Sequence, residues 1–357
     1  MTSIQWLPEG FSHPMPFGSR PHSPPTALLM QVFQKLMTLL GAGLMLASGT
    51  HCQGPIKTGQ WLIQNARPTP SALSWAAFTW ANDRMGSRYF EKTAMLVPAK
   101  VDGLPYDFVF QFDLGSNVTL LNGNTLTGLL AKHPAFDRTT THRNHLFKFW
   151  ESTTAFEDLS ITFGPTTATT RSCPVRRDYG ETMAFHGLHA GLPVNLGSIG
   201  ADLFQNKILV IDYPNRRFAV CDTLPAYLQT TFTTIALLED GRVILPLRLA
   251  NKSYKVLFDN GASVFSLLTS AAKINTFSTA APTDTIPVRS WGITHNVVGR
   301  PIKGAFDLAG QRFSDVTVYA DFRPSQQDAD YDAITGNALF WDKTVIIDFK
   351  KKAFGVK

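Results

Sequence analysis

The chain has 357 residues, of which 44% are apolar and 17% charged, and it carries a formal net charge of +6. With 26 glycines and 22 prolines, this composition is typical of a globular protein rich in β-structure. The positive charge is spread out, and its densest cluster, Lys350–Lys352, is expected in a solvated turn, so a nucleic-acid partner is excluded. We find no zinc spacing, phosphate loop or dinucleotide fingerprint, and His186 and His189 are expected in a loop, so no cofactor and no metal are predicted.

Residues 1–49 are predicted to be a secretory signal with a long leader. The apolar stretch Leu36–Ala47 is too short to span a bilayer comfortably, and small residues follow it. Ala47-Ser48-Gly49 offers a small-x-small cleavage site, and Met30 is an alternative start. We therefore expect an exported protein, either periplasmic or extracellular.

The chain has three cysteines, all of which follow the predicted signal. Cys52 suggests bacterial lipidation and membrane anchoring, although His51 stands where that signal favours Gly, Ala or Ser. Lipid anchoring is therefore kept as an alternative to simple cleavage. An oxidising compartment would allow a disulfide between Cys173 and Cys221, and two buried thiols are the alternative.

The rest of the chain divides into an N-terminal segment and two halves. Residues 50–88 mix Pro and Trp with a short predicted helix at 72–83, and they are expected to lie against the first half. We expect a first lobe at 89–224, a crossover at 225–239 and a second lobe at 240–357. Strands dominate both lobes, and short helices are expected at 201–205, 269–274 and 338–342.

The first half contains a strand pattern that runs into an Asp-x-Gly motif. Alternating residues from Met95 lead to the turn signal Asp102-Gly103, and the apolar run Phe108–Phe112 follows. The next residues are Asp-Leu-Gly-Ser at 113–116. A single Asp-x-Gly is an ordinary turn, so this motif gains meaning only from its surroundings.

The second half repeats these surroundings. The strand patterns Ile244–Leu249 and Val256–Phe258 lead into Asp-Asn-Gly-Ala at 259–262. Further downstream, equivalent residues keep an offset of 136 without a gap: Gly200–Phe204 with Gly336–Phe340, Ile208–Tyr213 with Thr344–Phe349, and Phe218 with Phe354. A repeat of this length indicates a duplicated architecture.

These residues resemble the two-lobed aspartic protease superfamily, which includes the pepsin-like and retropepsin-like enzymes, in a bacterial-type secreted form. The resemblance covers about Phe90 to Lys357. It implies a mainly β fold of two homologous, six-stranded-barrel-like lobes. It also implies that Ser198–Gly200 and Ile334–Gly336 are the apolar-apolar-Gly segments that thread beneath the two Asp loops.

The resemblance further implies a catalytic pair, Asp113 and Asp259. Two adjacent carboxyls share one proton, so the ionised one takes a proton from water while the protonated one hydrogen-bonds the scissile carbonyl. Gly115 and Gly261 allow the two loop backbones to turn sharply and approach each other. Ser116 is placed to hydrogen-bond the outer oxygen of Asp113, which Ala262 cannot do for Asp259.

The residue between Asp and Gly departs from the family pattern, which has Thr or Ser there. Leu114 has no donor, so the reciprocal lock between the loops cannot form, and Asn260 is expected to bond the opposite backbone from one side. A displacement of about 1 Å costs on the order of a hundredfold in rate, so this departure bears directly on turnover. We expect an exported aspartic endopeptidase; the alternatives are a catalytically silent peptide-binding relative and an envelope-attached structural protein.

A hairpin that closes over the cleft is expected after each motif. In the second half it spans 288–304, with Trp291 near its bend, and in the first half it spans about 145–155 and carries Trp150. Both tryptophans are substrate-flap candidates, and the alternative is that they are core or surface aromatics. We expect a monomer that acts on a peptide or protein substrate.

Overall fold

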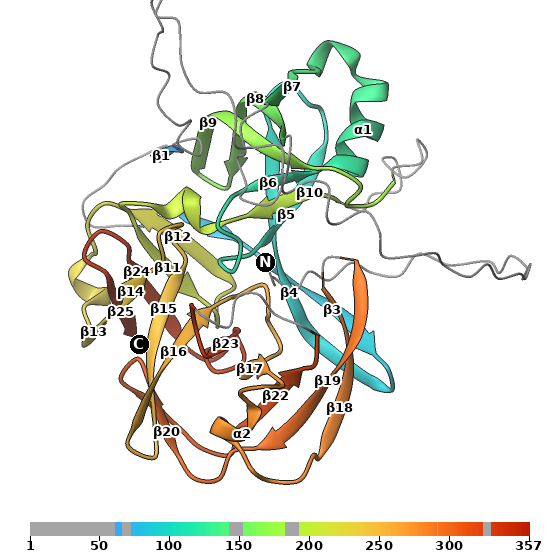
Figure 1. Ribbon diagram of the computed structural model, residues 1–357. Helices are drawn as coiled ribbons and strands as arrows, with labels where there is room; N and C mark the ends of the chain where they lie inside the picture. Colours follow the sequence, from blue (N-terminus) through green and yellow to red (C-terminus); the bar gives the residue numbers. More distant parts are fainter. Residues whose placement is uncertain (1–60, 66–72, 143–152, 183–192, 291, 324–329) are drawn as a thin grey trace, which may run out of the picture. The chain divides into compact units, whose positions relative to one another are not determined.

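The computed structural model describes residues 61–65, 73–142, 153–182, 193–290, 292–323 and 330–357. These residues form a mainly β structure whose strands gather into three sheets (Figure 1). Within these ranges no helix is long and apolar enough to cross a membrane. The predicted signal, the paired histidines, Cys52, Trp150 and Trp291 lie outside the described residues.

The first sheet, here called the N-terminal sheet, has nine strands. They are β1 (Leu62–Asn65), β3 (Thr79–Met85), β4 (Arg88–Val101), β5 (Asp107–Phe112), β6 (Leu120–Asn122), β7 (Thr139–His142), β8 (Thr153–Phe163), β9 (Thr166–Arg176) and β10 (Val194–Ile199). β4 and β5 form the hairpin predicted around Asp102-Gly103, where Gly103 has a φ of +81°. The path of paired strands returns on itself, because β8 pairs with both β4 and β9. After β6 the chain forms α1 (Gly123–Lys132) and the 3-10 helix η1 (Pro134–Phe136).

The second sheet, here called the C-terminal sheet, has ten strands, which are coloured gold to red in Figure 1. They are β14 (Ala236–Leu237), β15 (Val243–Leu249), β16 (Lys252–Phe258), β17 (Leu267–Ser270), β18 (Asp284–Ser290), β19 (Ile293–Pro301), β20 (Phe306–Leu308), β21 (Gln311–Phe313), β22 (Thr317–Asp321) and β23 (Ala333–Thr335). β15 and β16 form the predicted hairpin, and its two turn residues, Ala250 and Asn251, both have positive φ. β18 and β19 form the hairpin expected at 288–304, with bounds of 284–301.

The third sheet, here called the joining sheet, takes strands from both halves of the chain. It contains β2 (Trp75–Ala77), β11 (Ile208–Asp212), β12 (Arg217–Cys221), β13 (Phe232–Thr234), β24 (Thr344–Asp348) and β25 (Ala353–Val356). β11 and β24 are repeat equivalents and pair antiparallel, with Val210 opposite Ile346 at the centre. Because Val210 and Ile346 are themselves 136 residues apart, equivalent residues lie symmetrically about this pair. The sequence repeat is therefore also a structural repeat.

A matching group of three phenylalanines lies beneath each Asp-x-Gly motif. Phe112, which precedes the first motif, packs on Phe204 and Phe218 with ring centroids 5.3 and 5.1 Å apart. In the second half both corresponding distances are 5.8 Å, among the equivalent residues Phe258, Phe340 and Phe354. All six rings are buried in one continuous core. Aromatic pairs of this geometry contribute about 0.5–1.5 kcal/mol each beyond their burial, so each motif starts from a rigid base.

The helix predicted at 72–83 is wrong. These residues form β2 and β3, and β3 pairs along β4 with Thr79 opposite Leu96. Two partner strands, β4 and β12, pair with the backbone of this segment, and such tertiary pairing outweighs local helix propensity. Residues 75–85 are therefore mostly strand and not helix.

The three short helices have mixed outcomes. The 3-10 helix η3 (Ala201–Phe204) lies where one was expected, whereas residues 338–342 form turns. The helix expected at 269–274 begins later, as α2 (Ile274–Phe277), because β17 continues through Ser270. The crossover also contains η4 (Ala226–Leu228).

Two further expectations are resolved by the described residues. The N-terminal and C-terminal sheets have nine and ten strands instead of six each, and neither is a clear barrel. Cys173 and Cys221 are free thiols, so of the two alternatives the disulfide is wrong. Cys173 is fully buried in β9 and Cys221 only partly buried in β12.

Candidate functional site

Both predicted aspartates lie where a strand ends beside a partner strand from the same half. β5 ends at Phe112 and β16 ends at Phe258, and the next residue in each case is a fully buried Asp. β10 runs parallel to β5, and β23 runs parallel to β16. The Asp113 N–H donates to the Ile199 carbonyl and the Asp259 N–H to the Thr335 carbonyl, both at 2.9 Å. The apolar-apolar-Gly segments therefore hold the first backbone group of each motif.

The glycine of each motif faces the carboxyl of the other motif. A Cβ built on Gly115 would collide with the Asp259 carboxyl, and one on Gly261 would lie 2.7 Å from Asp113 Oδ1. These contacts are reciprocal, so the two loops approach each other through their glycines. Only a residue without a side chain leaves room for the opposite carboxyl at either position.

The two carboxyls accept hydrogen bonds from their own loops. Asp113 Oδ1 accepts from Ser116 N at 3.1 Å, and Asp259 Oδ1 accepts from Gly261 N at 2.9 Å and Ala262 N at 3.2 Å. Burial raises the pKa of Asp259 to about 6, although these N–H groups, the Asp113 side chain and the charge of Arg242 oppose that rise. The pair therefore keeps one proton as the pH rises to about 6.

Ser116 does not act as the sequence suggested. Its hydroxyl donates to the Val118 carbonyl at 2.7 Å, and only its backbone N–H reaches Asp113. Its own carbonyl accepts from the Ala201 N–H at 2.9 Å. The Ser116 side chain thus braces the loop backbone, because a nearby carbonyl outcompetes the carboxyl for its single proton.

Asn260 makes the one-sided lock that was expected. Its Oδ1 accepts from the Leu114 N–H at 2.5 Å, while its Nδ2 points to Met95 Sδ at 3.7 Å. An N–H can donate only to the amide oxygen, which fixes the orientation of this side chain. The Leu114 side chain is buried in the core and offers no polar group in return.

Three residues near the pair carried no recognisable signal in the sequence: Tyr179, Arg242 and Asn337. Burial raises the pKa of Tyr179 to about 12, with the cations Arg176 and Arg289 lowering it and the Asp113 charge raising it further. The Arg176 guanidinium stacks over the Tyr179 ring at 4.7 Å. Tyr179 lies in the loop after β9, within electrostatic range of Asp113, and Arg289 on β18 acts on Tyr179. Only the tertiary fold brings such isolated residues together.

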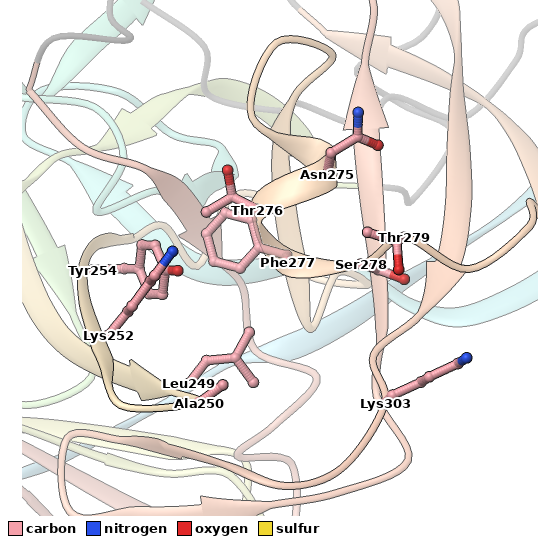
Figure 2. Close-up of a pocket in the computed structure, with 10 residues that line it drawn as sticks. All are labelled: Leu249, Ala250, Lys252, Tyr254, Asn275, Thr276, Phe277, Ser278, Thr279 and Lys303. Atoms are coloured by element: carbon pink, nitrogen blue, oxygen red, sulfur yellow. The ribbon is translucent and has the colours of Figure 1, made fainter.

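Two other concavities lie away from the motifs. Figure 2 shows one of about 230 Å³ between the β15–β16 turn and α2, where Tyr254 packs on Phe277 with Lys252 and Lys303 at its edges. It is smaller than the roughly 300–1,000 Å³ usual for ligand pockets. The other, of about 680 Å³, includes Asp107 and Phe108 and therefore lies at the opposite end of β5 from Asp113. Neither contains a residue of the motifs.

The motif residues form a carboxylate pair with loop donors around it. In the part of the chain that the structure describes, no three His, Cys, Asp or Glu side chains gather as a metal ion requires. The two flap tryptophans fall outside that part, so the structure does not place them. The sequence matches no protein-family model and no curated protein.

Proposed function

We propose that the protein is an exported aspartic endopeptidase of the pepsin-like or retropepsin-like type, with Asp113 and Asp259 as its catalytic pair. The observation that carries this proposal is the reciprocal approach of two repeat-related Asp-x-Gly loops, in which each glycine faces the opposite carboxyl. The closed path of paired strands in the N-terminal sheet and the symmetric β11–β24 pairing support a two-lobed architecture. The substrate is a peptide or protein, and the acting form is a monomer.

The mechanism follows from the shared proton. The two carboxyls share one proton, since burial raises the pKa of Asp259 to about 6 while the Asp113 side chain hydrogen-bonds it. The ionised carboxyl takes a proton from water as the oxygen attacks the scissile carbonyl, while the protonated carboxyl donates to the carbonyl oxygen. The tetrahedral diol then breaks its C–N bond, and the proton taken from water passes to the leaving nitrogen. The diol returns a proton to the carboxyl that donated one, which regenerates the pair.

A cleavage assay tests the proposal. The mature protein is incubated with a peptide library at several values from about pH 3 to pH 8, and products are identified by mass spectrometry. We expect internal peptide-bond cleavage that pepstatin inhibits and that Asp113→Asn abolishes. Absence of cleavage over the whole pH range would refute the enzyme assignment.

A peptide-binding protein without turnover is the second candidate. It is favoured by Leu114, which removes one half of the lock between the loops, and by the complete burial of both carboxyls. This candidate predicts that peptides bind the wild-type protein without being cleaved. Titration calorimetry with library peptides that show no cleavage separates it from the enzyme.

Export and lipid attachment form a separate proposal about the N-terminus, which lies outside the described residues. Labelling of cells with a radioactive fatty acid tests it. Label on the wild-type protein that is lost in Cys52→Ala supports a lipid anchor and the envelope-attached alternative. An unlabelled protein recovered from the periplasm or medium supports simple signal cleavage.

A further inference from the structure

A buried asparagine holds the second motif from behind. Asn337 follows Gly336 directly and is fully buried. Its Nδ2 donates to the Asn260 carbonyl at 2.9 Å and to Ser263 Oγ at 3.0 Å, while its Oδ1 accepts from the Tyr213 hydroxyl at 2.7 Å. Both ends of the amide are thus engaged, and one of its contacts is the backbone of the residue that bonds Leu114.

The hydroxyl that orients Asn337 comes from the other half of the chain. Tyr213 follows β11 of the joining sheet, and its ring stacks on Trp80 with centroids 6.1 Å apart and planes 10° apart. Phe78 packs edge-on against the same ring at 6.3 Å. Burial raises the pKa of Tyr213 above its ordinary value, so the phenol stays neutral and remains a donor.

Ser263 ties the same loop to a third element. Its hydroxyl accepts from Asn337 Nδ2 and donates to the Lys92 carbonyl in β4 at 2.7 Å. The loop that carries Asp259 is therefore anchored by three segments distant in sequence: β4, the end of β11, and the residues after β23. The three contacts of Asn337 are buried, where a hydrogen bond is stronger than it is in water, and the contact of Ser263 with Lys92 is partly buried.

The first motif has a different anchor. The repeat equivalent of Asn337 is Ala201, which has no polar side-chain atom. In its place Asp202 Oδ1 accepts from Thr119 N at 2.7 Å and Thr119 Oγ1 at 2.8 Å, and neither contact touches Leu114. A side chain therefore supports the middle residue of the motif in the second half, where Asn337 bonds Asn260. Asn260 is also the residue that links the two loops.

We propose that Asn337 and Tyr213 are positioning residues that replace the missing half of the lock between the two motifs. Tyr213 orients the Asn337 amide, Asn337 fixes the Asn260 backbone, and Asn260 then holds Leu114 N and with it the spacing of Asp113 from Asp259. This inference rests on the proposed function and adds to it the means by which a chain with Leu114 aligns its catalytic pair.

Tyr213→Phe is the direct test, because it deletes one oxygen and keeps the ring that packs on Trp80. We expect kcat to fall about tenfold in Tyr213→Phe and about a hundredfold in Asn337→Ala, with KM within about twofold, because a misaligned pair slows chemistry more than it weakens binding. The matched control is Tyr106→Phe, which loses a hydroxyl contact of 2.9 Å to His133 Nε2 at the far end of β5 and keeps its kcat. An unchanged kcat in folded Tyr213→Phe would overturn the proposal.

A second readout separates this inference from the proposed function. If the wild-type protein cleaves nothing, the enzyme assignment fails, but the alignment can still be followed by carbon-13 NMR titration of the Asp259 carboxyl in the mature protein. In Tyr213→Phe a looser loop admits water, so the pKa of Asp259 falls from about 6 toward its ordinary value. Ser263→Ala, which removes the contact to Lys92, should lower it in the same direction if Tyr213→Phe does not fold. A pKa unchanged in the folded variants contradicts the positioning role.

Discussion

Asp259 combines complete burial with three opposing influences on its charge. Burial favours the protonated carboxyl, whereas two loop N–H groups, the neighbouring Asp113 side chain and the Arg242 cation favour the ionised form. Arg242 is itself nearly buried and is paired with Asp240 at 2.9 Å. The residues around the pair thus set the pH range in which one proton is shared.

Replacing Arg242 should shift the pH dependence of cleavage. Arg242→Leu removes a cation that lowers the pKa of Asp259, so that pKa rises and the decline of kcat/KM on the alkaline side moves to higher pH. Complete pH profiles of kcat/KM measure the shift. Arg312→Leu, which removes an exposed pair with Asp307, is the control and should leave the profile in place. An unmoved alkaline limb in Arg242→Leu would show that Asp259 does not control it.

Asp259 should also make the protein less stable as the pH rises. Its folded pKa of about 6 lies above the ordinary value of 3.8, so the folded state binds the proton more tightly and the free energy of unfolding falls between about pH 4 and pH 6. A difference of about two pKa units corresponds to about 3 kcal/mol as an upper figure. We expect Asp259→Asn to be more stable than the wild type at pH 7 by about 1–3 kcal/mol, with little difference at pH 4.

Urea unfolding of both proteins at the two pH values measures this effect. Asp202, whose pKa burial also raises to about 6, is present in both proteins and cancels from the comparison. Equal stability of wild type and Asp259→Asn at pH 7 would mean that the carboxyl is solvated in the folded protein.

Among the structural elements, the two motif loops depend on their glycines because of where the opposite carboxyl lies. Gly115→Ala places a methyl group against the Asp259 carboxyl, so the loops must separate. We expect cleavage to fall by about a hundredfold or more and stability to fall by about 1–3 kcal/mol. Gly304→Ala is the control, because a Cβ there meets nothing within 4 Å but is strained by a φ of +86°. A Gly115→Ala enzyme that kept full activity while Gly304→Ala lost stability would contradict the close approach of the loops.

The elements also show how far the sequence could lead. The β4–β5 hairpin was predictable because Asp102-Gly103 is a strong local turn signal, and the equivalence of β11 and β24 because the offset of 136 is unbroken. That these two strands pair with each other was not predicted. The helix predicted at 72–83 failed because the pairing that makes it strands comes from β4 and β12, which are distant in the chain.

The residues of the candidate site could be chosen from the sequence, but only some of their hydrogen-bond partners could be predicted. The duplicated motif identified Asp113, Asp259 and the one-sided role of Asn260. The Ser116 hydroxyl was misassigned because a local pattern cannot show that the Val118 carbonyl is closer. Asn337 was missed because its partner Tyr213 lies 124 residues away.

The two halves of the molecule meet through repeat-equivalent strands in the joining sheet. Val210 and Ile346 are fully buried, lie opposite each other across β11 and β24, and belong to one apolar cluster. Cross-strand neighbours of this kind interact by about 0.2–1 kcal/mol. The stability of each half is therefore coupled to that of the other.

A double-mutant cycle measures this coupling. We expect Val210→Ala and Ile346→Ala to be non-additive by at least about 0.5 kcal/mol in the free energy of unfolding. The comparison pair, Val210→Ala with Val288→Ala, joins residues of different clusters and should be additive. Additivity in both cycles would indicate that the halves unfold independently.

We propose that Asp113 and Asp259 act together to hydrolyse a peptide bond. The most direct test is the kcat/KM of the mature protein on a peptide substrate for the wild type, Asp113→Asn, Asp259→Asn and Asp348→Asn. Asp348 is a buried aspartate of the joining sheet that accepts the Lys351 N–H, and it serves as the control. We expect cleavage by the wild type and Asp348→Asn and none by either motif variant. Cleavage that survives in Asp113→Asn or Asp259→Asn would contradict it.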